Sequence, residues 1–321
     1  MPLSPLALSL PLSPRVLLCS EPLIDRSIPL ALRHRPLPRS LSTMAAAASP
    51  FDCVLLDLDD TLYPGSAGIG LATKRNIDEF LMARCGLTAE RASALRVELF
   101  RSYGSSLAGL IALGYDVHPD EYHSYVHGRL PYDRIAADPN LAGLLRSIPQ
   151  RKVLFTNSDR AHMRKALQRL GVDEAIFDDV VCFETMNPRL FGDEAEPAGP
   201  GDRPAVILKP SVDAIVAALR VAGTNPHRTL FLDDSERNIA AGKALGLRTA
   251  LVGKKVRSEE ADYALESIGS LRRTIPEIWG GVASNGGGGG GEQLNHGVEM
   301  KNKKGMRSDL DSIIEPTSIH A

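Results

Sequence analysis

The chain has 321 residues, of which 43% are hydrophobic and 24% charged, and its formal net charge is −2 at pH 7. This composition is typical of a globular protein, and the near balance of charge gives no support for a nucleic-acid-binding surface. No run of about 18 apolar residues is present, so the sequence predicts no transmembrane helix. The cysteines have no paired spacing, which favours buried thiols in a reducing compartment over a disulfide framework or a zinc site. They are Cys19, Cys53, Cys85 and Cys182.

The first 43 residues differ in composition from the rest. They are rich in Leu, Pro and Ser, with five Arg, no Lys and only two acids, Glu21 and Asp25. This is typical of an organellar transit peptide, which would place the protein in a chloroplast or mitochondrion. The alternative is a translated upstream region, with Met44 as the true start of a cytoplasmic protein. On either interpretation, we expect residues 1–49 to form an N-terminal extension outside the fold.

The first expected strand carries two carboxylates at its end. The apolar run 53–56 leads into Asp57, and Asp59 follows two residues later. Alternation along a strand sends residues i and i+2 to the same face, so both carboxylates point to one place. Two like charges at close range are costly unless a cation or a proton compensates them. The spacing therefore predicts a divalent metal, a shared proton, or both.

The next segment has helical periodicity. Apolar residues at helical spacing precede Gly86, and Gly104 and Gly114 are further stop signals. Pro119, followed by two acids, suits a helix start. The expected helices are one ending at Gly86 and others over 89–103, over 107–113 and from Pro119. A run of helices inserted into an α/β protein predicts a separate small domain.

An α/β alternation resumes after residue 138, which predicts a parallel sheet with right-handed crossovers. The expected helices are 141–148, 161–170, 212–222 and 236–245. The expected strands are 153–155, 180–183, 229–232 and 249–252. Residues 186–204, rich in Gly, Pro and acids, are expected to form a surface loop. Six consecutive glycines at 286–291 lie in a polar tail, so disorder is expected over 280–321.

Three more apolar stretches end in polar groups. Those groups are Thr156 with Asn157, Lys209, and Asp233 with Asp234. In open parallel α/β sheets, ligands bind at the carboxyl ends of the strands. Together with the segment that ends at Asp57, these make four segment ends, and we expect their polar residues to converge on one pocket.

The four segments resemble the four motifs of the haloacid dehalogenase-like (HAD) hydrolase superfamily: Asp-x-Asp-x-Thr, a strand-end Thr, a Lys and an Asp pair. The resemblance covers roughly residues 50–279. It implies an α/β fold, a Rossmann-like parallel sheet core with an inserted helical cap. The core would comprise residues 50–67 and 139–279, and the cap residues 68–138.

The resemblance also implies a Mg²⁺-dependent phosphate monoester hydrolase that forms an aspartyl-phosphate. Asp57 would be the nucleophile, and Asp59 would protonate the leaving alkoxide and then activate water. Asp60, on the opposite alternation phase, is expected to be a turn residue, and Thr61 to fix the loop through its hydroxyl. Thr156, Asn157 and Lys209 would bind the phosphoryl oxygens.

The implied Mg²⁺ site uses four acids. Asp57, the Asp59 backbone carbonyl and Asp233 would be direct ligands, with Asp234 acting through water. Many members of the superfamily carry a further Asp shortly after the Asp pair. Here the corresponding residue is Asn238. Whether a side chain at this position supports Asp233 and Asp234 is therefore an open question.

Three longer sequence segments resemble those of the pyrimidine 5′-nucleotidase branch of this superfamily, including its fungal and plant members. They are 103–110, 155–159 and 231–239. The implied substrates are UMP and CMP. Tyr103 and Gly104 are candidate specificity residues, with Tyr103 stacking on a base or lining the pocket. Alternatively, Tyr103 is a core residue at a helix end.

Two alternatives to a nucleotidase remain open. One is a phosphatase of another small metabolite, such as FMN, a sugar phosphate or a lysophospholipid. The other is a non-catalytic regulatory protein on this fold. Three histidines in the expected cap, His118, His123 and His127, raise a separate question. Their spacing places His123 and His127 on one helix face, but the sequence shows no third metal ligand, which favours packing or solvent-facing roles.

Overall fold

The computed structural model describes residues 48–191 and 205–280. The expected N-terminal extension up to residue 47, residues 192–204 of the expected loop and the glycine-rich tail lie outside the described residues. In the part that is described, no helix is long and apolar enough to cross a membrane.

A six-stranded parallel sheet forms the centre of the fold, in the order β3-β2-β1-β4-β5-β6. Cys53 of β1 lies opposite Arg151 on one side and Thr229 on the other. The expected α/β class with a parallel sheet is confirmed. The strands are β1 (Cys53–Leu56), β2 (Arg151–Phe155), β3 (Asp179–Val181), β4 (Thr229–Asp233), β5 (Arg248–Val252) and β6 (Tyr263–Leu265).

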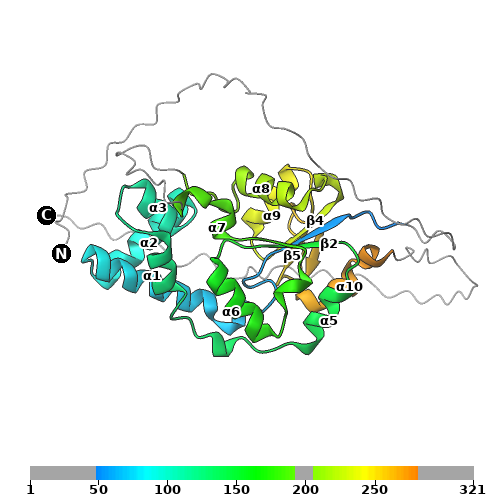
Figure 1. The fold of residues 1–321 in the computed structure, drawn as a ribbon, viewed down its shortest axis with the longest axis horizontal. Coiled ribbons are helices and arrows are strands. Elements are labelled where there is room, and N and C mark those ends of the chain that lie inside the picture. Colours follow the sequence, from blue (N-terminus) through cyan, green and yellow to red (C-terminus); the bar gives the residue numbers. More distant parts are fainter. Residues whose placement is uncertain (1–47, 192–204, 281–321) are drawn as a thin grey trace, which may run out of the picture. The chain divides into compact units, whose positions relative to one another are not determined.

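The two faces of the sheet bury alternate residues of each strand. In β1, Val54 and Leu56 pack into one hydrophobic cluster, while Cys53 and Leu55 pack into the other. Figure 1 shows α8 and α9 on one side of the sheet and α5, α6 and α10 on the other. Burial on both faces explains why these strands are continuous apolar runs.

The helices of the sheet region lie close to the expected ones. They are α5 (Pro139–Ser147), α6 (Arg160–Leu170), α7 (Phe183–Met186), α8 (Val212–Ala222), α9 (Glu236–Ala244) and α10 (Leu271–Thr274). Each long helix has a local start signal. Asp159 accepts hydrogen bonds from the first turn of α6, and Ser211 accepts one at the start of α8.

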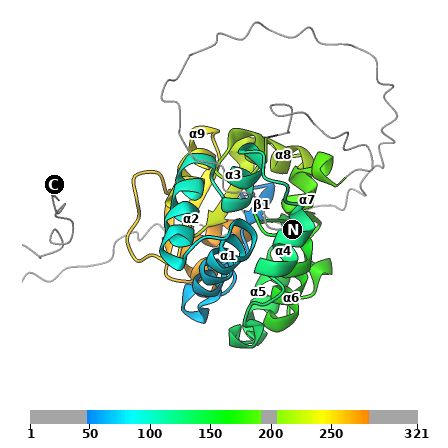
Figure 2. The same ribbon diagram turned by 90° about the vertical axis from the view of Figure 1, so that its left-hand side faces the viewer.

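Four helices lie between β1 and α5, and we call residues 69–126 the helical insert. They are α1 (Ile69–Cys85), α2 (Ala89–Tyr103), α3 (Ser106–Ala112) and α4 (Pro119–Val126). Gly86 and Gly104 end α1 and α2 in the left-handed conformation, which explains the stop signals in the sequence. Figure 2 shows the four helices grouped on the side turned toward the viewer.

Two expectations need correction, and one strand was missed. The apolar stretch 205–208 is not a strand: its backbone pairs with a side chain, because Ile207 N–H donates to Asn187 Oδ1 (2.7 Å) and Asn187 Nδ2 donates to Ile207 O (2.9 Å). The strand expected at 180–183 ends at Val181, and Phe183 begins α7. The edge strand β6 was not expected, because it is only three residues long.

Candidate active site

Three adjacent strand ends bring the motif residues together. Asp57 follows β1, Thr156 follows β2 and Asp233 ends β4, and β2, β1 and β4 are neighbours in the sheet. Lys209 reaches the same place from a loop, with its side chain buried. The expected convergence at the carboxyl edge of the sheet is therefore observed, although Lys209 does not follow a strand.

The ammonium group of Lys209 has three acceptors. Its Nζ donates to Asp57 Oδ1 (2.6 Å), Asp233 Oδ2 (2.8 Å) and the Phe155 carbonyl (2.7 Å). Burial disfavours the charged form, but the carboxylates of Asp233 and Asp57 outweigh it and hold the pKa of Lys209 above its usual value. Lys209 therefore stays a cation between two carboxylates that would otherwise repel each other.

Both carboxylate oxygens of Asp57 are fixed. The Thr61 hydroxyl donates to Oδ2 (2.9 Å), as expected for a residue that orders this loop, while Lys209 holds Oδ1. Burial raises the pKa of Asp57, and nearby Asp233 and Asp59 add to the rise while Lys209 opposes it. Asp60 adopts a left-handed conformation with φ of 58°, which is the expected turn.

Asp233 is oriented from its other side by α9. Its Oδ1 accepts hydrogen bonds from Ser235 N–H and from Asn238 Nδ2, both at 2.9 Å. Asn238 therefore supports the acid pair by donating a hydrogen bond. Burial and the charge of Asp233 raise the pKa of neighbouring Asp234 to about 6.

The acids at these strand ends suit a hard cation. Oxygens of Asp57, Asp233 and Asp234 lie within 4.8 Å of one another. A set of carboxylate oxygens is what Mg²⁺ prefers, with water filling the remaining octahedral positions. The donor set therefore fits the cofactor that the sequence resemblance implies.

Thr156 and Asn157 organise the loop after β2. The Thr156 hydroxyl oxygen accepts a hydrogen bond from Ser158 N–H (3.1 Å). The Asn157 amide pairs with the backbone of Lys209: Nδ2 donates to the Lys209 carbonyl (3.0 Å), and Lys209 N–H donates to Oδ1 (2.8 Å). Asn157 thus positions Lys209, a contact that the sequence did not predict.

Asp59 lies in a different environment from Asp57. Its Oδ1 accepts from the Tyr63 hydroxyl and from His162 Nε2 (2.7 Å), and its Oδ2 accepts from the Ser158 hydroxyl (2.8 Å). Burial opposes ionisation of Asp59, but the charge of His162 and these hydrogen bonds outweigh it and lower the pKa. Asp59 is therefore held as a carboxylate.

His162 is the main site residue that sequence analysis missed. The hydroxyl of Tyr132 donates to the His127 carbonyl (3.1 Å), so it accepts a hydrogen bond from His162 Nδ1 (2.9 Å). Both ring nitrogens then donate, as in an imidazolium. Burial lowers the pKa of His162, but the charge of Asp59 outweighs it and the net shift is upward. The available signal was a histidine in the first turn of the helix that follows β2.

The family of the chain follows from comparison with known proteins. A family model described as haloacid dehalogenase-like hydrolase matches residues 51–246, which include every motif residue above. The chain belongs to the haloacid dehalogenase-like hydrolase family. In this HAD-like hydrolase, the acids of the motifs and the buried Lys209 gather at one edge of the parallel sheet.

Two curated relatives match this HAD-like hydrolase at 25% identity. "Phosphate metabolism protein 8" of Saccharomyces cerevisiae matches over 200 residues, 60% of this chain and 58% of that protein. The pyrophosphatase PpaX of Halalkalibacterium halodurans matches over 124 residues, 37% of this chain and 48% of that one. The chain spans about half the length of each of these relatives.

Solved structures are similar at lower identity. CbbY from Rhodobacter sphaeroides, in complex with phosphate, is 20% identical, with a TM-score of 0.47 over 69% of this chain and 96% of that one. The putative HAD-hydrolase YfnB from Bacillus subtilis, bound to magnesium, is 18% identical, with a TM-score of 0.43 over 70% and 97% of the two chains.

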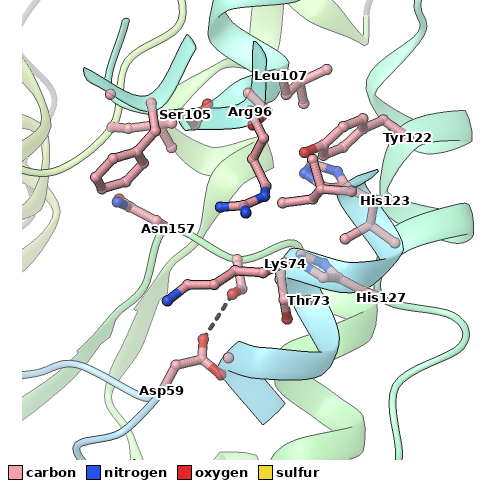
Figure 3. Close-up of a pocket in the computed structure, with 18 of the residues that line it drawn as sticks. Asp59, Thr73, Lys74, Arg96, Ser105, Leu107, Tyr122, His123, His127 and Asn157 are labelled. Carbon is pink, nitrogen blue, oxygen red and sulfur yellow. Dashed lines mark hydrogen bonds between the residues drawn. The ribbon is translucent and has the colours of Figure 1, made fainter. Parts of the chain in front are cut away.

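A cavity of about 610 Å³ lies between the motif loops and the helical insert of this HAD-like hydrolase. Asp59, Asn157 and His162 line it from the sheet side, together with Phe183 of α7 and Leu208, and residues of α1 to α4 line it from the insert side. Figure 3 shows Arg96 extended into the cavity above Lys74, with His123 and His127 along one wall.

The two specificity candidates differ in position. Gly104 lines the cavity, but Tyr103 is not among the lining residues and its side chain is 41% exposed. Tyr103 is therefore neither the buried helix-end residue of one interpretation nor part of the cavity wall in this conformation. Phe100, one turn earlier on α2, lines the cavity, and the Arg237 guanidinium lies 5.7 Å from its ring centroid.

Proposed function

We propose that the protein is a Mg²⁺-dependent phosphate monoester hydrolase that acts through an aspartyl-phosphate, and that its substrates are pyrimidine nucleoside 5′-monophosphates. The observation that carries the phosphatase part is the buried bridge of Lys209 between Asp57 and Asp233 beside a second carboxylate, Asp59. A cation at this place stabilises the negative oxygens of a phosphoryl group.

In the first step, a carboxylate oxygen of Asp57 attacks phosphorus while the bond from phosphorus to the ester oxygen breaks. Asp59 gives its proton to the departing oxygen. In the second step, Asp59 takes a proton from water, the water oxygen bonds to phosphorus, and the bond to Asp57 breaks. Lys209 and the Thr156 hydroxyl hold the phosphoryl oxygens through both steps.

We interpret the contacts of Asp59 with His162, Tyr63 and Ser158 as those of the enzyme before substrate binds. A carboxylate with a lowered pKa is a poor proton donor. Asp59 therefore has to leave His162 and become protonated before it serves the leaving group. Its side chain lines the cavity, so a rotation takes it toward a bound ester.

Asp57, Asp233 and Asp234 would hold the Mg²⁺, which when bound supplies positive charge against the phosphoryl oxygens. The Asp59 backbone carbonyl would complete the protein ligands, as the resemblance implies. The preference for oxygen ligands supports Mg²⁺ over softer metals.

The substrate proposal rests on the three sequence segments that resemble pyrimidine 5′-nucleotidases and on the size and lining of the cavity. A volume of about 610 Å³ is within the range of about 300–1,000 Å³ for small-molecule sites. Phe100 offers an aromatic face to the part of the substrate beyond the phosphate, and Arg96, oriented by its ion pair with Asp78 (2.7 Å), extends its guanidinium into the same space. The printed names of both curated relatives refer to phosphate chemistry, which supports the reaction class. FMN, sugar phosphates and lysophospholipids are the alternative substrates.

The test is a panel of phosphate monoesters assayed with Mg²⁺ and with excess chelator. We expect UMP and CMP to be hydrolysed faster than AMP and GMP, and all activity to disappear with chelator. Hydrolysis of other esters but not of UMP or CMP would leave the phosphatase and reject the nucleotidase. No hydrolysis of any ester would favour a regulatory protein, and equal rates in chelator would reject the metal.

A further inference from the structure

A second cluster of potential metal ligands borders the same cavity, and His162 separates it from Asp59. His123 belongs to α4, His127 caps the end of the same helix, and Asp159 precedes α6. One ligand atom from each lies within 4.8 Å of the other two. Figure 3 shows the two imidazoles next to each other on the α4 side of the cavity. The sequence offered the two histidines without a third ligand, and the fold supplies Asp159.

Asp159 is already oriented for such a role. Its Oδ2 accepts hydrogen bonds from the N–H groups of Ala161 and His162, both at 3.2 Å, so the first turn of α6 fixes the carboxylate. Its Oδ1 contacts His127 Nδ1. Backbone contacts of this kind orient a ligand in many metal sites, because they leave one oxygen directed at the ion.

His123 has an unsatisfied ring nitrogen. The residue is only 7% exposed, and its Nδ1 is buried with no hydrogen-bond partner among the described residues. Its ring stacks on that of His127, with centroids 5.3 Å apart, and packs edge-on against Phe183. A buried nitrogen without a partner is costly, which points to a ligand at this position.

We propose that His123, His127 and Asp159 bind a divalent transition metal, specifically Zn²⁺, and that this ion ties α4 of the helical insert to the start of α6. Two imidazoles and one carboxylate form a ligand set of zinc sites that keep a fourth position open. The set of Asp57, Asp233 and Asp234 offers oxygen only and suits Mg²⁺. The two sites therefore differ in the cation that they prefer.

The neighbouring His162 is not part of the ligand set. Its ring lies 4.9 Å from that of His127, but its nitrogens bond Asp59 and Tyr132. Zn²⁺ would replace the hydrogen bond between His127 and Asp159, so the present pair marks the place of the ion. Because His123 and His127 line the cavity, the open position faces the space for the substrate.

The experiment is a calorimetric titration of Zn²⁺ into the full-length protein, stripped of metal and kept in saturating Mg²⁺ so that the carboxylate site is occupied. We expect a Zn²⁺ site in the wild type that weakens at least about tenfold in His123→Ala and in His127→Ala. His118→Ala is the matched control, because His118 is exposed and lies at the other end of α4. Equal Zn²⁺ affinity in all four proteins would overturn the proposal.

A second measurement needs no variant. Co²⁺ bound by imidazoles in a four-coordinate site absorbs visible light more strongly than Co²⁺ among six oxygens. Addition of Co²⁺ to the Mg²⁺-saturated wild type is expected to give the strong bands, and Zn²⁺ to remove them. Zn²⁺ is also expected to raise the Tm of the wild type but not of His123→Ala. Only the weak oxygen-type spectrum, with no Zn²⁺-dependent rise in Tm, would reject the site even if a variant failed to fold.

Discussion

The sheet side and the insert side of the cavity differ in how their polar groups are held. On the sheet side, Lys209 is 3% exposed and has three protein acceptors, and both oxygens of Asp57 are bonded. On the insert side, Asp78 holds Arg96 (2.7 Å), but Lys74 of α1 reaches into the cavity as an exposed side chain and Phe100 is 51% exposed. Fixed groups suit a reaction whose transition state does not change from substrate to substrate. Exposed groups suit the part that recognises the rest of the substrate.

The largest effect is expected on the sheet side, from Asp57→Asn. An amide does not attack phosphorus, so the rate of ester hydrolysis should fall by several orders of magnitude. Steady-state turnover of a small aryl phosphate measures this. Asp60→Asn is the matched control, because Asn also tolerates the left-handed turn, and it should keep turnover of the wild-type order. Substantial turnover by a purified, folded Asp57→Asn protein would contradict the covalent mechanism.

The next effect concerns Asp59 and its partner His162. Asp59→Asn should lower turnover by about 10²–10⁴-fold, because proton transfer to the leaving oxygen is lost. His162→Gln should cost less, because glutamine still donates to Asp59 but carries no charge. The difference between the two variants separates the proton donor from the residue that positions it.

The pH dependence distinguishes these roles further. The fold raises the pKa of His162. The ion pair of His162 with Asp59 therefore stabilises the folded protein fully at pH values below the usual histidine pKa. This stabilisation is lost as the pH rises through the raised pKa of His162. The pKa of Asp59 is lowered, so its share is lost only in strong acid. Because Asp59 has to be protonated before it serves the leaving group, turnover by the wild type should fall as pH rises through the raised pKa of His162 and this neighbouring proton is lost. A His162→Gln profile with the same alkaline limb would contradict this coupling.

The contrast between the two sides also explains what the sequence predicted. The ends of strands and helices depend on local signals, such as runs of apolar residues and the stop signals Gly86 and Gly104. The predicted ends of these elements were correct to within a few residues. The motif residues converge because parallel strands share a carboxyl edge. Predicting these features requires only the residues that are close in sequence and the rule that ligands bind at the carboxyl ends of parallel strands.

Contacts between distant side chains were not predictable in this way. His162 reaches Asp59 across 103 positions, and Asn157 reaches Lys209 across 52. Asp159 joins His127 across 32 positions. Each contact depends on how helices pack on the sheet, and a single sequence contains no periodicity that marks it. The pairing of Asn187 with residue 207, within the apolar stretch that leads to Lys209, has the same origin.

A smaller effect is expected on the insert side, where substitutions should change the choice of substrate. Phe100→Ala removes an aromatic face from the cavity, and stacking of a base on such a face is worth about 1–3 kcal/mol. The kcat/KM for UMP should therefore fall about tenfold relative to that for a small aryl phosphate. Tyr103→Ala, outside the lining, is the comparison. An equal change in the Tyr103 variant would restore the specificity role predicted for that residue, and a uniform loss on every ester would reject selection by the insert.

The smallest effect is expected from removing residues 1–43 and 284–321. The last described turn closes the core: Ile278 is fully buried, its carbonyl accepts from Gln150 Nε2 (2.6 Å), and Trp279 Nε1 donates to the Ser147 carbonyl (2.6 Å). A chain of residues 44–283 keeps these contacts and should match the full-length Tm and turnover closely. A chain of residues 44–275 loses them. Loss of a buried Ile side chain alone costs about 2–5 kcal/mol, so its Tm should fall by several degrees. A comparable fall in the 44–283 chain would show that residues beyond 283 or before 44 contribute to the core.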